Sequence, residues 1–219
     1  MKGLKMKKAK LLILSVLAFG FICIHVSSVS AAKTKTVSTN LSPQERAELA
    51  FYVYADNKSV LNHYSPSGWM GDSKDLIFNQ EYRKDVYAGK TCIQVKYTPK
   101  GGNRWVGIYW QQPANNWGSN PDGYDLNKAT FITFWAKGET GSEVISEVKI
   151  GGFKGDYPDS GSAFKKNIKL TQDWKLYHID LRKTDLTRIA GGFSFTVTKK
   201  DNPNGATFYL DEIRYEMEK

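Results

Sequence analysis

The chain has 219 residues, with 31 basic and 22 acidic side chains and a formal net charge of +9. Five of the basic residues lie among the first ten, so from residue 33 onward 26 bases face 22 acids, a net charge of only +4. This weak, scattered charge argues against a nucleic-acid binder, which usually shows a strong basic stripe. The remaining residues, about 187, suffice for one domain with a buried core.

The first 32 residues have the pattern of a secretory signal peptide. Lysines precede an apolar run over residues 11–26, and small residues follow up to Ala31 and Ala32, where we expect cleavage. The apolar run is too short for a comfortable membrane span, and none follows it. We therefore expect a secreted or cell-surface protein that is not inserted in a membrane once the signal is removed. Cys23 leaves a lipoprotein alternative open, although a small residue is expected before a lipidated cysteine and Ile22 is large.

Loss of the signal leaves Cys92 as the single cysteine, so no internal disulfide can form. Cys92 lies in the strand-like run Lys90–Val95, which favours a buried structural thiol over a nucleophile. A secreted domain without disulfides depends on its core, or on a bound ion, for stability.

The rest of the chain predicts one all-β domain. Residues 33–48 form a polar leader and a short helix, for which Ser42 is a suitable cap and Glu45 completes a capping box. Short β-rich runs between glycine, proline and asparagine turns fill residues 49–219. The predicted strands are Leu49–Ala55, Leu76–Asn79, Thr91–Thr98, Trp105–Gln111, Thr130–Ala136, Val144–Ile150, Phe164–Leu170, Lys175–Leu181, Phe193–Thr198 and Thr207–Tyr215. This series predicts a β-sandwich or jelly roll, which we expect to be a monomer.

The strand Trp105–Gln111 is the most informative of the series. Its alternation gives a core-suited face of Val106, Ile108 and Trp110 and an opposite face of Trp105, Gly107, Tyr109 and Gln111. Rings beside a glycine and an amide form a flat strip, on which the CH face of a sugar can stack while its hydroxyls meet polar groups. The alternative is that this face is covered too, because a one-residue error in register exchanges the two faces.

Aromatic residues in polar loops are further candidates. Trp69, Trp117 and Tyr157 all lie in segments rich in glycine, asparagine or aspartate, and loops on a rigid sandwich often carry binding residues. The alternative is that these rings close the ends of the sandwich. Trp135 and Trp174, within a strand and at the start of one, are interpreted as core residues.

Six segments together have a pattern shared with one fold family. They are Leu61–Asp72, Tyr109–Gly118 and Phe208–Ile213, with Tyr124–Leu126, Phe134–Gly138 and Asp173–Lys175 between them. Over residues 51–216 the sequence resembles the galactose-binding-like β-jelly-roll modules of bacterial carbohydrate-binding proteins and of relatives of the complex I intermediate-associated protein. The resemblance implies non-catalytic glycan binding, often beside an attached enzyme, whereas in this sequence we expect the module to stand alone. Fold by itself does not fix the ligand.

The resemblance also implies a structural calcium ion near the ends of the domain. An acid of the closing strand and groups of the first loop would hold it, and the matching residues are Asp211 and Asp56, with Asn57 beside the latter. The alternative is that Asp211 pairs with Arg214 or a neighbouring lysine.

These observations give one expected function and two alternatives. The side chains expected to bind carbohydrate are Trp105, Tyr109, Trp117, Trp69 and Tyr157 by stacking and Gln111, Asn116 and Arg104 by hydrogen bonds. A lyase or glycosidase on the same fold is the first alternative, although neither Glu143 with Glu147 nor Asp211 with Glu212 forms a dense acidic motif, and His63 and His178 lie in unrelated settings. A cell-envelope protein-interaction domain, with its aromatic residues buried, is the second.

Overall fold

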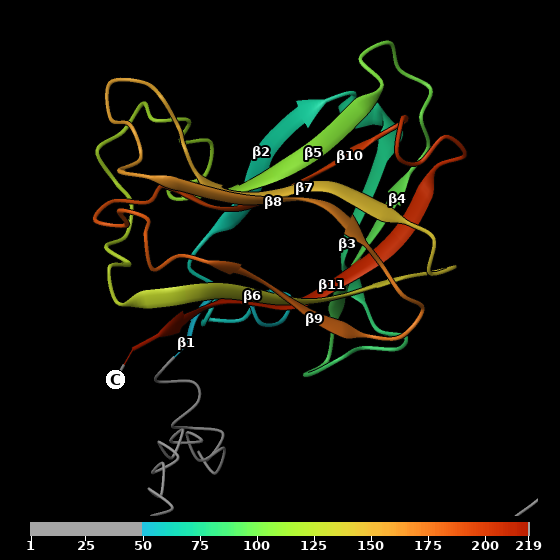
Figure 1. Ribbon diagram of the computed structural model, residues 1–219, viewed down its shortest axis with the longest axis horizontal. Helices are drawn as coiled ribbons and strands as arrows, with labels where there is room; N and C mark the ends of the chain where they lie inside the picture. The colour runs from blue at the N-terminus through green and yellow to red at the C-terminus, as the bar shows by residue number, and fades with distance from the viewer. Residues whose placement is uncertain (1–49, 219) are drawn as a thin grey trace, which may run out of the picture. The chain divides into compact units, whose positions relative to one another are not determined.

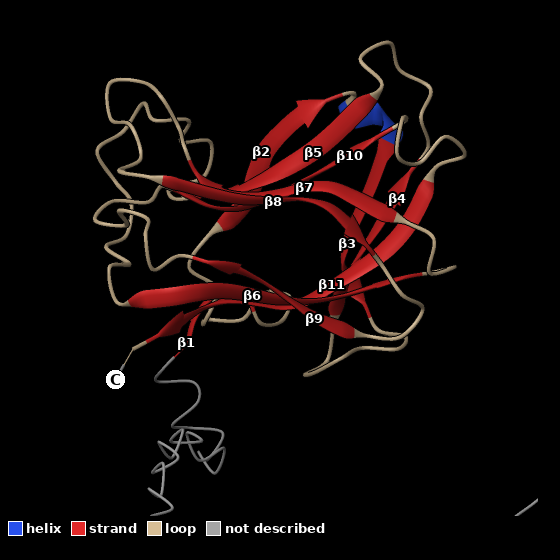
Figure 2. Ribbon diagram, viewed as in Figure 1, coloured by secondary structure: helices blue, strands red, loops and turns tan. Residues whose placement is uncertain are grey.

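The computed structural model describes residues 50–218. The expected signal peptide, the polar leader and the helix start at Ser42 lie outside these residues. Within them the chain forms strands joined by loops and a single turn of 3-10 helix (Figure 1; Figure 2).

The strands form two antiparallel sheets. In chain order they are β1 (Ala50–Tyr54), β2 (Ser65–Gly71), β3 (Leu76–Tyr82), β4 (Cys92–Tyr97), β5 (Trp105–Gln111), β6 (Ala129–Gly138), β7 (Val144–Gly151), β8 (Ser162–Lys169), β9 (Lys175–Asp180), β10 (Gly191–Thr198) and β11 (Ala206–Met217). Sheet A has the order β3-β4-β11-β6-β9, with β1 beside β11, and sheet B has the order β2-β5-β10-β7-β8. The helix η1 (Ser73–Asp75) joins β2 to β3.

Ten of the described strands occur where the sequence predicts them, and β5 has the predicted bounds. The exception is β2, where Pro66, Ser67 and Gly68 predict a turn. Proline lacks a backbone N–H and glycine lacks a side chain to pack, so this segment does not have strand composition. It is nevertheless a strand, because it lies at the edge of sheet B and pairs with β5 alone, a position in which proline is tolerated.

The core lies between the two sheets, and the alternation of β5 is confirmed. Val106, Ile108 and Trp110 are fully buried in it. The Trp110 ring lies 5.5 Å from the ring of Phe193 in β10 and 5.6 Å from that of Phe78 in β3, measured between centroids. Because Phe78 belongs to sheet A, the Trp110 indole packs across the sandwich and fixes which face of β5 points inward.

The opposite face of β5 contributes to two rows of side chains on the outer face of sheet B. Strand pairing aligns Gly68, Tyr109, Ser194, Lys149 and Phe164 in the first row, and Met70, Gly107, Thr196, Glu147 and Lys166 in the second. Each row crosses all five strands of the sheet, so residues far apart in the sequence meet on one surface.

Replacing Trp110 with alanine tests this register. We expect Trp110→Ala to lower the free energy of unfolding by about 3–5 kcal/mol, because it leaves a cavity between the sheets. Trp105→Ala, on the partly exposed face of the same strand, should cost about 1 kcal/mol or less. Urea unfolding of both variants gives the comparison, and equal losses would contradict the assignment of the two faces.

Candidate functional site

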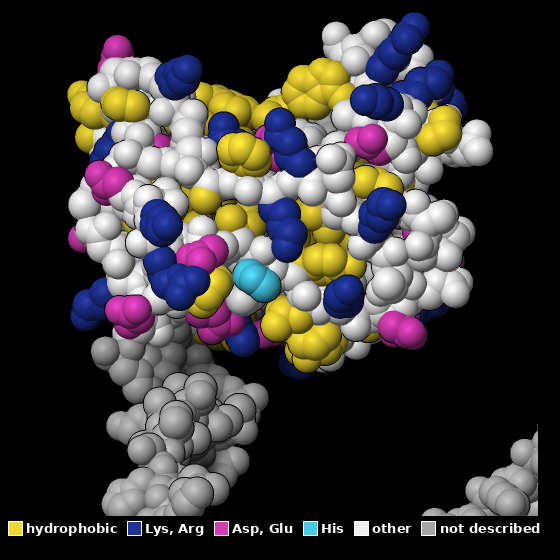
Figure 3. All heavy atoms as spheres, viewed as in Figure 1, with side chains coloured by type: hydrophobic (Ala, Val, Ile, Leu, Met, Phe, Trp, Pro, Cys, Tyr) yellow, Lys and Arg dark blue, Asp and Glu magenta, His cyan; other side chains and the backbone are white. Residues whose placement is uncertain are grey.

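The outer face of sheet B is hollowed. In Figure 3 the surface dips along the top of the view, between two raised groups of residues. Figure 1 shows that the β4–β5 loop (98–104) rises at one end of sheet B, and that the β5–β6 loop (112–128) and the β7–β8 loop (152–161) lie at the other. We call this hollow, with the two rows of sheet B as its floor, the sheet B groove.

Trp117 presents a ring at one end of the groove. Its side chain is 42% exposed, and its ring packs edge-on against Tyr109 with 6.1 Å between centroids and at a tilt against Phe153 with 5.3 Å between centroids. Gly68 permits this approach, since a β-carbon there would lie within 2.9 Å of Tyr109, Gln111 and Trp117. The exposed indole thus rests on buried groups and loses little freedom when a ligand binds.

Asn116 fixes the loop that carries Trp117. Its Oδ1 accepts the N–H groups of residues 118–120 at 3.0–3.1 Å, and its Nδ2 donates to the carbonyl of Gln112 at 3.0 Å. Asn116 is fully buried. The expectation that its amide contacts a sugar hydroxyl is therefore corrected, because this amide is already used to shape the loop.

Tyr109 and Gln111 lie on the predicted face of β5, but they are covered. Tyr109 is 5% exposed, its hydroxyl donates to the carbonyl of Gly151 at 2.6 Å, and burial raises its pKa above the ordinary value. Gln111 is fully buried, with Oε1 accepting from the hydroxyl of Ser67 at 2.8 Å and Nε2 without a partner among residues 50–218. Their predicted contacts with a ligand are corrected, because both side chains lie beneath Trp117 and support it.

The β7–β8 loop closes the same end of the groove. Tyr157 is 42% exposed, and its N–H donates to the carbonyl of Gly118 at 2.9 Å, which joins its loop to that of Trp117. Asp159 is buried and accepts the N–H of Phe153 at 3.0 Å. This hydrogen bond fixes the backbone of Phe153, whose ring packs against Trp117. The structure therefore brings together two of the predicted aromatic residues, Trp117 and Tyr157.

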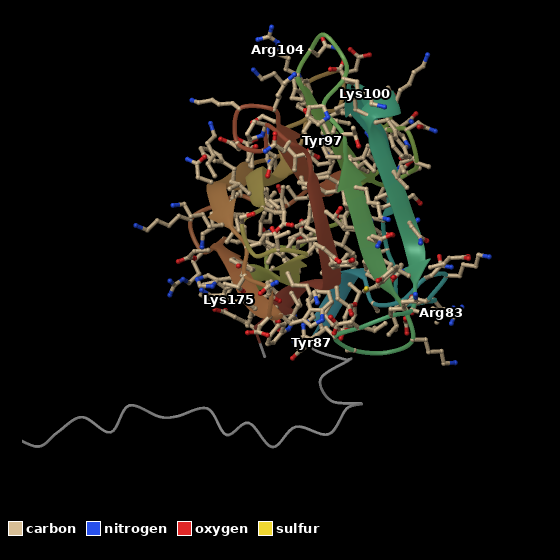
Figure 4. All side chains as sticks on the ribbon, turned by 90° about the vertical axis from the view of Figure 1, so that its right-hand side faces the viewer. Arg83, Tyr87, Tyr97, Lys100, Arg104 and Lys175 are labelled. Carbon is tan, nitrogen blue, oxygen red and sulfur yellow. The ribbon has the colours of Figure 1, made fainter. Side chains whose placement is uncertain are left out.

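Trp105 and Arg104 lie at the other end of β5. Trp105 is partly exposed and packs on Gly71, where a β-carbon would lie 3.0 Å from the indole. Asp72 accepts the N–H of Arg104 at 2.8 Å, and the guanidinium has no partner among the described residues. Figure 4 shows Arg104 at the tip of the loop with Lys100 nearby. Both predicted residues thus remain candidates for ligand contact.

Trp69 lies on the side of β2 that faces away from the sheet B groove. It is 45% exposed, but it pairs with Ile108, whose side chain is in the core, and its ring packs edge-on against Phe78 of β3 at 6.1 Å. Trp69 therefore covers the open edge between the two sheets and does not share a face with Trp105.

Four residues of the groove were not among the predicted site residues: Met70, Lys149, Phe153 and Phe164. Lys149 alternates with the buried Val148 and Ile150, which from sequence alone indicates an ordinary solvated face. Only the strand order, in which β10 separates β7 from β5, places Lys149 in a row with Tyr109.

A second aromatic cluster lies on sheet A. Tyr87 stacks on Trp135 with 3.8 Å between centroids, the indole N–H of Trp174 donates to the carbonyl of Asp85 at 3.2 Å, and Lys137 pairs with the Asp85 carboxylate. Figure 4 shows Tyr87 at the end of the domain opposite to Arg104. The interpretation of Trp135 and Trp174 as core residues is wrong, because both are only partly buried and hold the β3–β4 loop against the sheet.

Asp56 and Asp211 hold the same loop. Asp56 accepts the N–H groups of Lys90–Thr91 at 2.7–3.1 Å, and Asp211 accepts those of Tyr87–Ala88 at 3.1 Å. Calcium needs six to eight oxygen ligands, whereas these oxygens already receive N–H donors, and no three His, Cys, Asp or Glu side chains gather within residues 50–218. The two aspartates therefore do not fit the calcium site that the resemblance implies. Cys92 beside them is buried as predicted, and burial raises its pKa to about 12.

The acid pair considered for catalysis does not face one cleft. Glu143 is buried and accepts the N–H groups of Thr140 and Ser142 at 3.0 and 3.1 Å. Glu147 lies on the floor of the sheet B groove and pairs with Lys166 at 3.4 Å. Glycoside hydrolysis requires two carboxyl groups across one cleft, and this pair does not provide them.

Solved carbohydrate-binding modules have the same fold. A family 30 carbohydrate-binding module aligns over 80% of this chain and 90% of its own, with a TM-score of 0.51 and 15% identity. A family 11 module from Clostridium thermocellum, in complex with a β-1,3-1,4-mixed-linked tetrasaccharide, aligns over 73% and 91%, with a TM-score of 0.50 and 17% identity. No protein-family model and no curated protein sequence matches the chain. At such low identity the likeness establishes the β-sandwich fold and leaves the ligand open.

Asp211→Asn tests the burial of this carboxyl. Burial raises the pKa of Asp211 to about 7, despite the N–H groups that favour its charged form. The folded protein thus holds this proton more tightly than the unfolded chain, whose pKa is about 3.9, and the stability that the group contributes is lost as the pH rises toward 7. Between pH 5 and pH 8 the wild type should lose about 2 kcal/mol of unfolding free energy relative to Asp211→Asn. Urea unfolding at both pH values measures this, and a constant difference would contradict it.

Chelation tests the fit of the aspartates to calcium. We expect the melting temperature to be the same in excess EDTA and in millimolar calcium, because backbone N–H groups occupy the carboxylates of Asp56 and Asp211. A calcium-dependent rise in melting temperature that Asp211→Asn abolishes would show that these residues bind the ion after all.

Proposed function

We propose that this chain is a secreted, non-catalytic carbohydrate-binding protein, and that the sheet B groove receives the saccharide. The observation that carries the proposal is the Trp117 indole, which is 42% exposed at the end of a hollow and is supported edge-on by the ring of Tyr109 and by the tilted ring of Phe153. A ring held rigidly at the end of a hollow, with one part exposed, is the arrangement on which the CH face of a sugar can stack.

The fold and the first 32 residues of the chain support the proposal. Solved modules with this fold are carbohydrate-binding, and one is in complex with a tetrasaccharide. The signal-like first 32 residues support export, and no helix within residues 50–218 is long and apolar enough to cross a membrane. The positions of Glu143 and Glu147 support binding without hydrolysis.

Binding combines stacking with polar contacts. Trp117 and Tyr157 offer rings at one end of the groove, and Trp105 offers one at the other. Four residues of extended strand separate Trp105 from Tyr109, about 13 Å, which is longer than one sugar ring. The groove therefore suits a chain of several sugar units rather than a monosaccharide. Thr196 and Glu147, partly exposed on the floor, supply groups for the hydroxyls.

The proposed binding is modest in strength. Each stacked ring contributes about 0.5–1.5 kcal/mol and each neutral hydrogen bond a similar amount. With two or three rings engaged, dissociation constants between micromolar and millimolar are expected.

Trp117→Ala tests the groove against a matched control. We expect the variant to bind oligosaccharides about tenfold more weakly, which corresponds to the loss of one stacked ring. Its melting temperature should change little, since the indole is exposed. Trp69→Ala removes an equally exposed indole from the other side of β2 and should bind as the wild type does. Isothermal titration against a panel of plant and bacterial polysaccharides measures both, and the opposite ranking of the two variants would overturn the site.

A further inference from the structure

We propose that the sheet B groove selects acidic saccharides, with the Lys149 ammonium binding a uronate carboxylate of the chain that stacks on Trp117. This inference rests on the proposed function and names the class of its ligand. The selectivity follows from the charged side chains of the groove, which were not among the predicted site residues.

Lys149 lies on the floor of the groove near its aromatic end. Ser194 pairs with both Lys149 and Tyr109, so Lys149 is two strand spacings, about 10 Å, from the residue beneath Trp117. Its ammonium leans toward the β7–β8 loop, because a β-carbon on Gly152 would lie 2.8 Å from Nζ. A carboxylate held there would belong to the same ligand that reaches Trp117.

This ammonium is not neutralised within the protein. None of the ion pairs among residues 50–218 includes Lys149. The nearest acid on the floor, Glu147, pairs instead with Lys166 at 3.4 Å. A partly buried ammonium without a counter-ion is a strong donor for an anionic ligand group.

Two acids at the ends of the groove, Asp75 and Asp159, are also occupied, whereas Asp122 and Asp156 on the surrounding loops are exposed to solvent. Asp75 accepts the N–H groups of Lys100 and Gly101 at 2.7 Å, and the buried Asp159 accepts that of Phe153. These carboxylates shape the loops and are turned toward the backbone. They therefore do little to cancel a positive field above the floor.

Basic side chains remain free at both ends. Lys154 is exposed beside Phe153, and Lys100 and Arg104 are exposed on the β4–β5 loop, none of them in an ion pair among the described residues. Figure 3 shows Lys and Arg side chains gathered at the upper right of the molecule, where that loop rises. Positive groups at both ends and one on the floor attract a negatively charged chain along the groove.

The arrangement suits a uronate better than a nucleic acid. A nucleic acid carries a phosphate at every nucleotide and is bound by a dense basic stripe. Here one unpaired ammonium, that of Lys149, lies on the floor, since Lys166 is paired with Glu147, and the net charge from residue 33 onward is only +4. A uronate polymer carries single carboxylates on sugar rings that can also stack. It therefore matches an unpaired ammonium that lies between aromatic side chains.

The experiment compares polygalacturonate with the same polymer after full methyl esterification, which removes the charge and keeps the sugar backbone. We expect affinity electrophoresis and isothermal titration to show at least tenfold tighter binding of the acid form by the wild type. Lys149→Met should remove this preference, and Lys149→Arg should retain most of it. Lys96→Met, which removes the same charge from the outer face of sheet A, should behave as the wild type does. The melting temperature of each variant verifies folding.

Three other outcomes would overturn the selectivity for acidic saccharides, and they differ in what they say about the proposed function. Equal binding of both polymers, or binding of neutral β-glucan and xylan only, overturns the inference and leaves the proposed function in place. Binding of none of these polysaccharides overturns both. Equally tight binding of a single-stranded DNA oligonucleotide, lost in Lys149→Met, would show a general polyanion site and overturn the selectivity for saccharides.

Discussion

The packing of Trp110 is the contact on which the other features of the groove depend. Its indole is fully buried between the sheets and touches Phe193 on one side and Phe78 on the other. Because side chains alternate along a strand, this single placement turns Trp105 and Tyr109 toward the outer face. A slip by one residue would bring both rings into the core and leave Trp110 in solvent, so core packing and the groove are set by the same register.

Buried and partly buried aspartates give loops of both sheets their shape. Asp75 holds the β4–β5 loop, Asp159 holds the β7–β8 loop, and Asp56 and Asp211 hold the β3–β4 loop, all by accepting backbone N–H groups. With Cys92 as its only cysteine, the described domain has no internal disulfide to do this. The bonds of Asp75 and Asp159 to the backbone are charge-assisted, hence stronger than neutral ones, and they fix the loops of the groove before a ligand arrives. The exposed rings are thus preorganised, which lowers the entropy lost on binding.

The sequence predicted most strands, because β-branched and aromatic residues alternate between clear turns, and it predicted the two faces of β5. It did not predict β2, whose Pro66 and glycines are tolerated only because the strand lies at a sheet edge. The burial of Tyr109, Gln111 and Asn116 also escaped prediction, since it depends on which loop folds over β5. Lys149 reaches the groove only through the order of strands in sheet B, a long-range feature that local pattern does not contain.

A saccharide in the groove would lie between Trp105 and Trp117. All six tryptophans lie within the described residues, and each gives one indole N–H signal in a proton–nitrogen correlation spectrum. Titration with oligogalacturonate and with mixed-linkage β-glucan oligosaccharides reports directly on all of them. We expect the signals of Trp117 and Trp105 to shift, while those of Trp110, Trp135 and Trp174 stay in place. A shift of the Trp135 and Trp174 signals with Trp117 unchanged would place the ligand on sheet A and contradict this expectation.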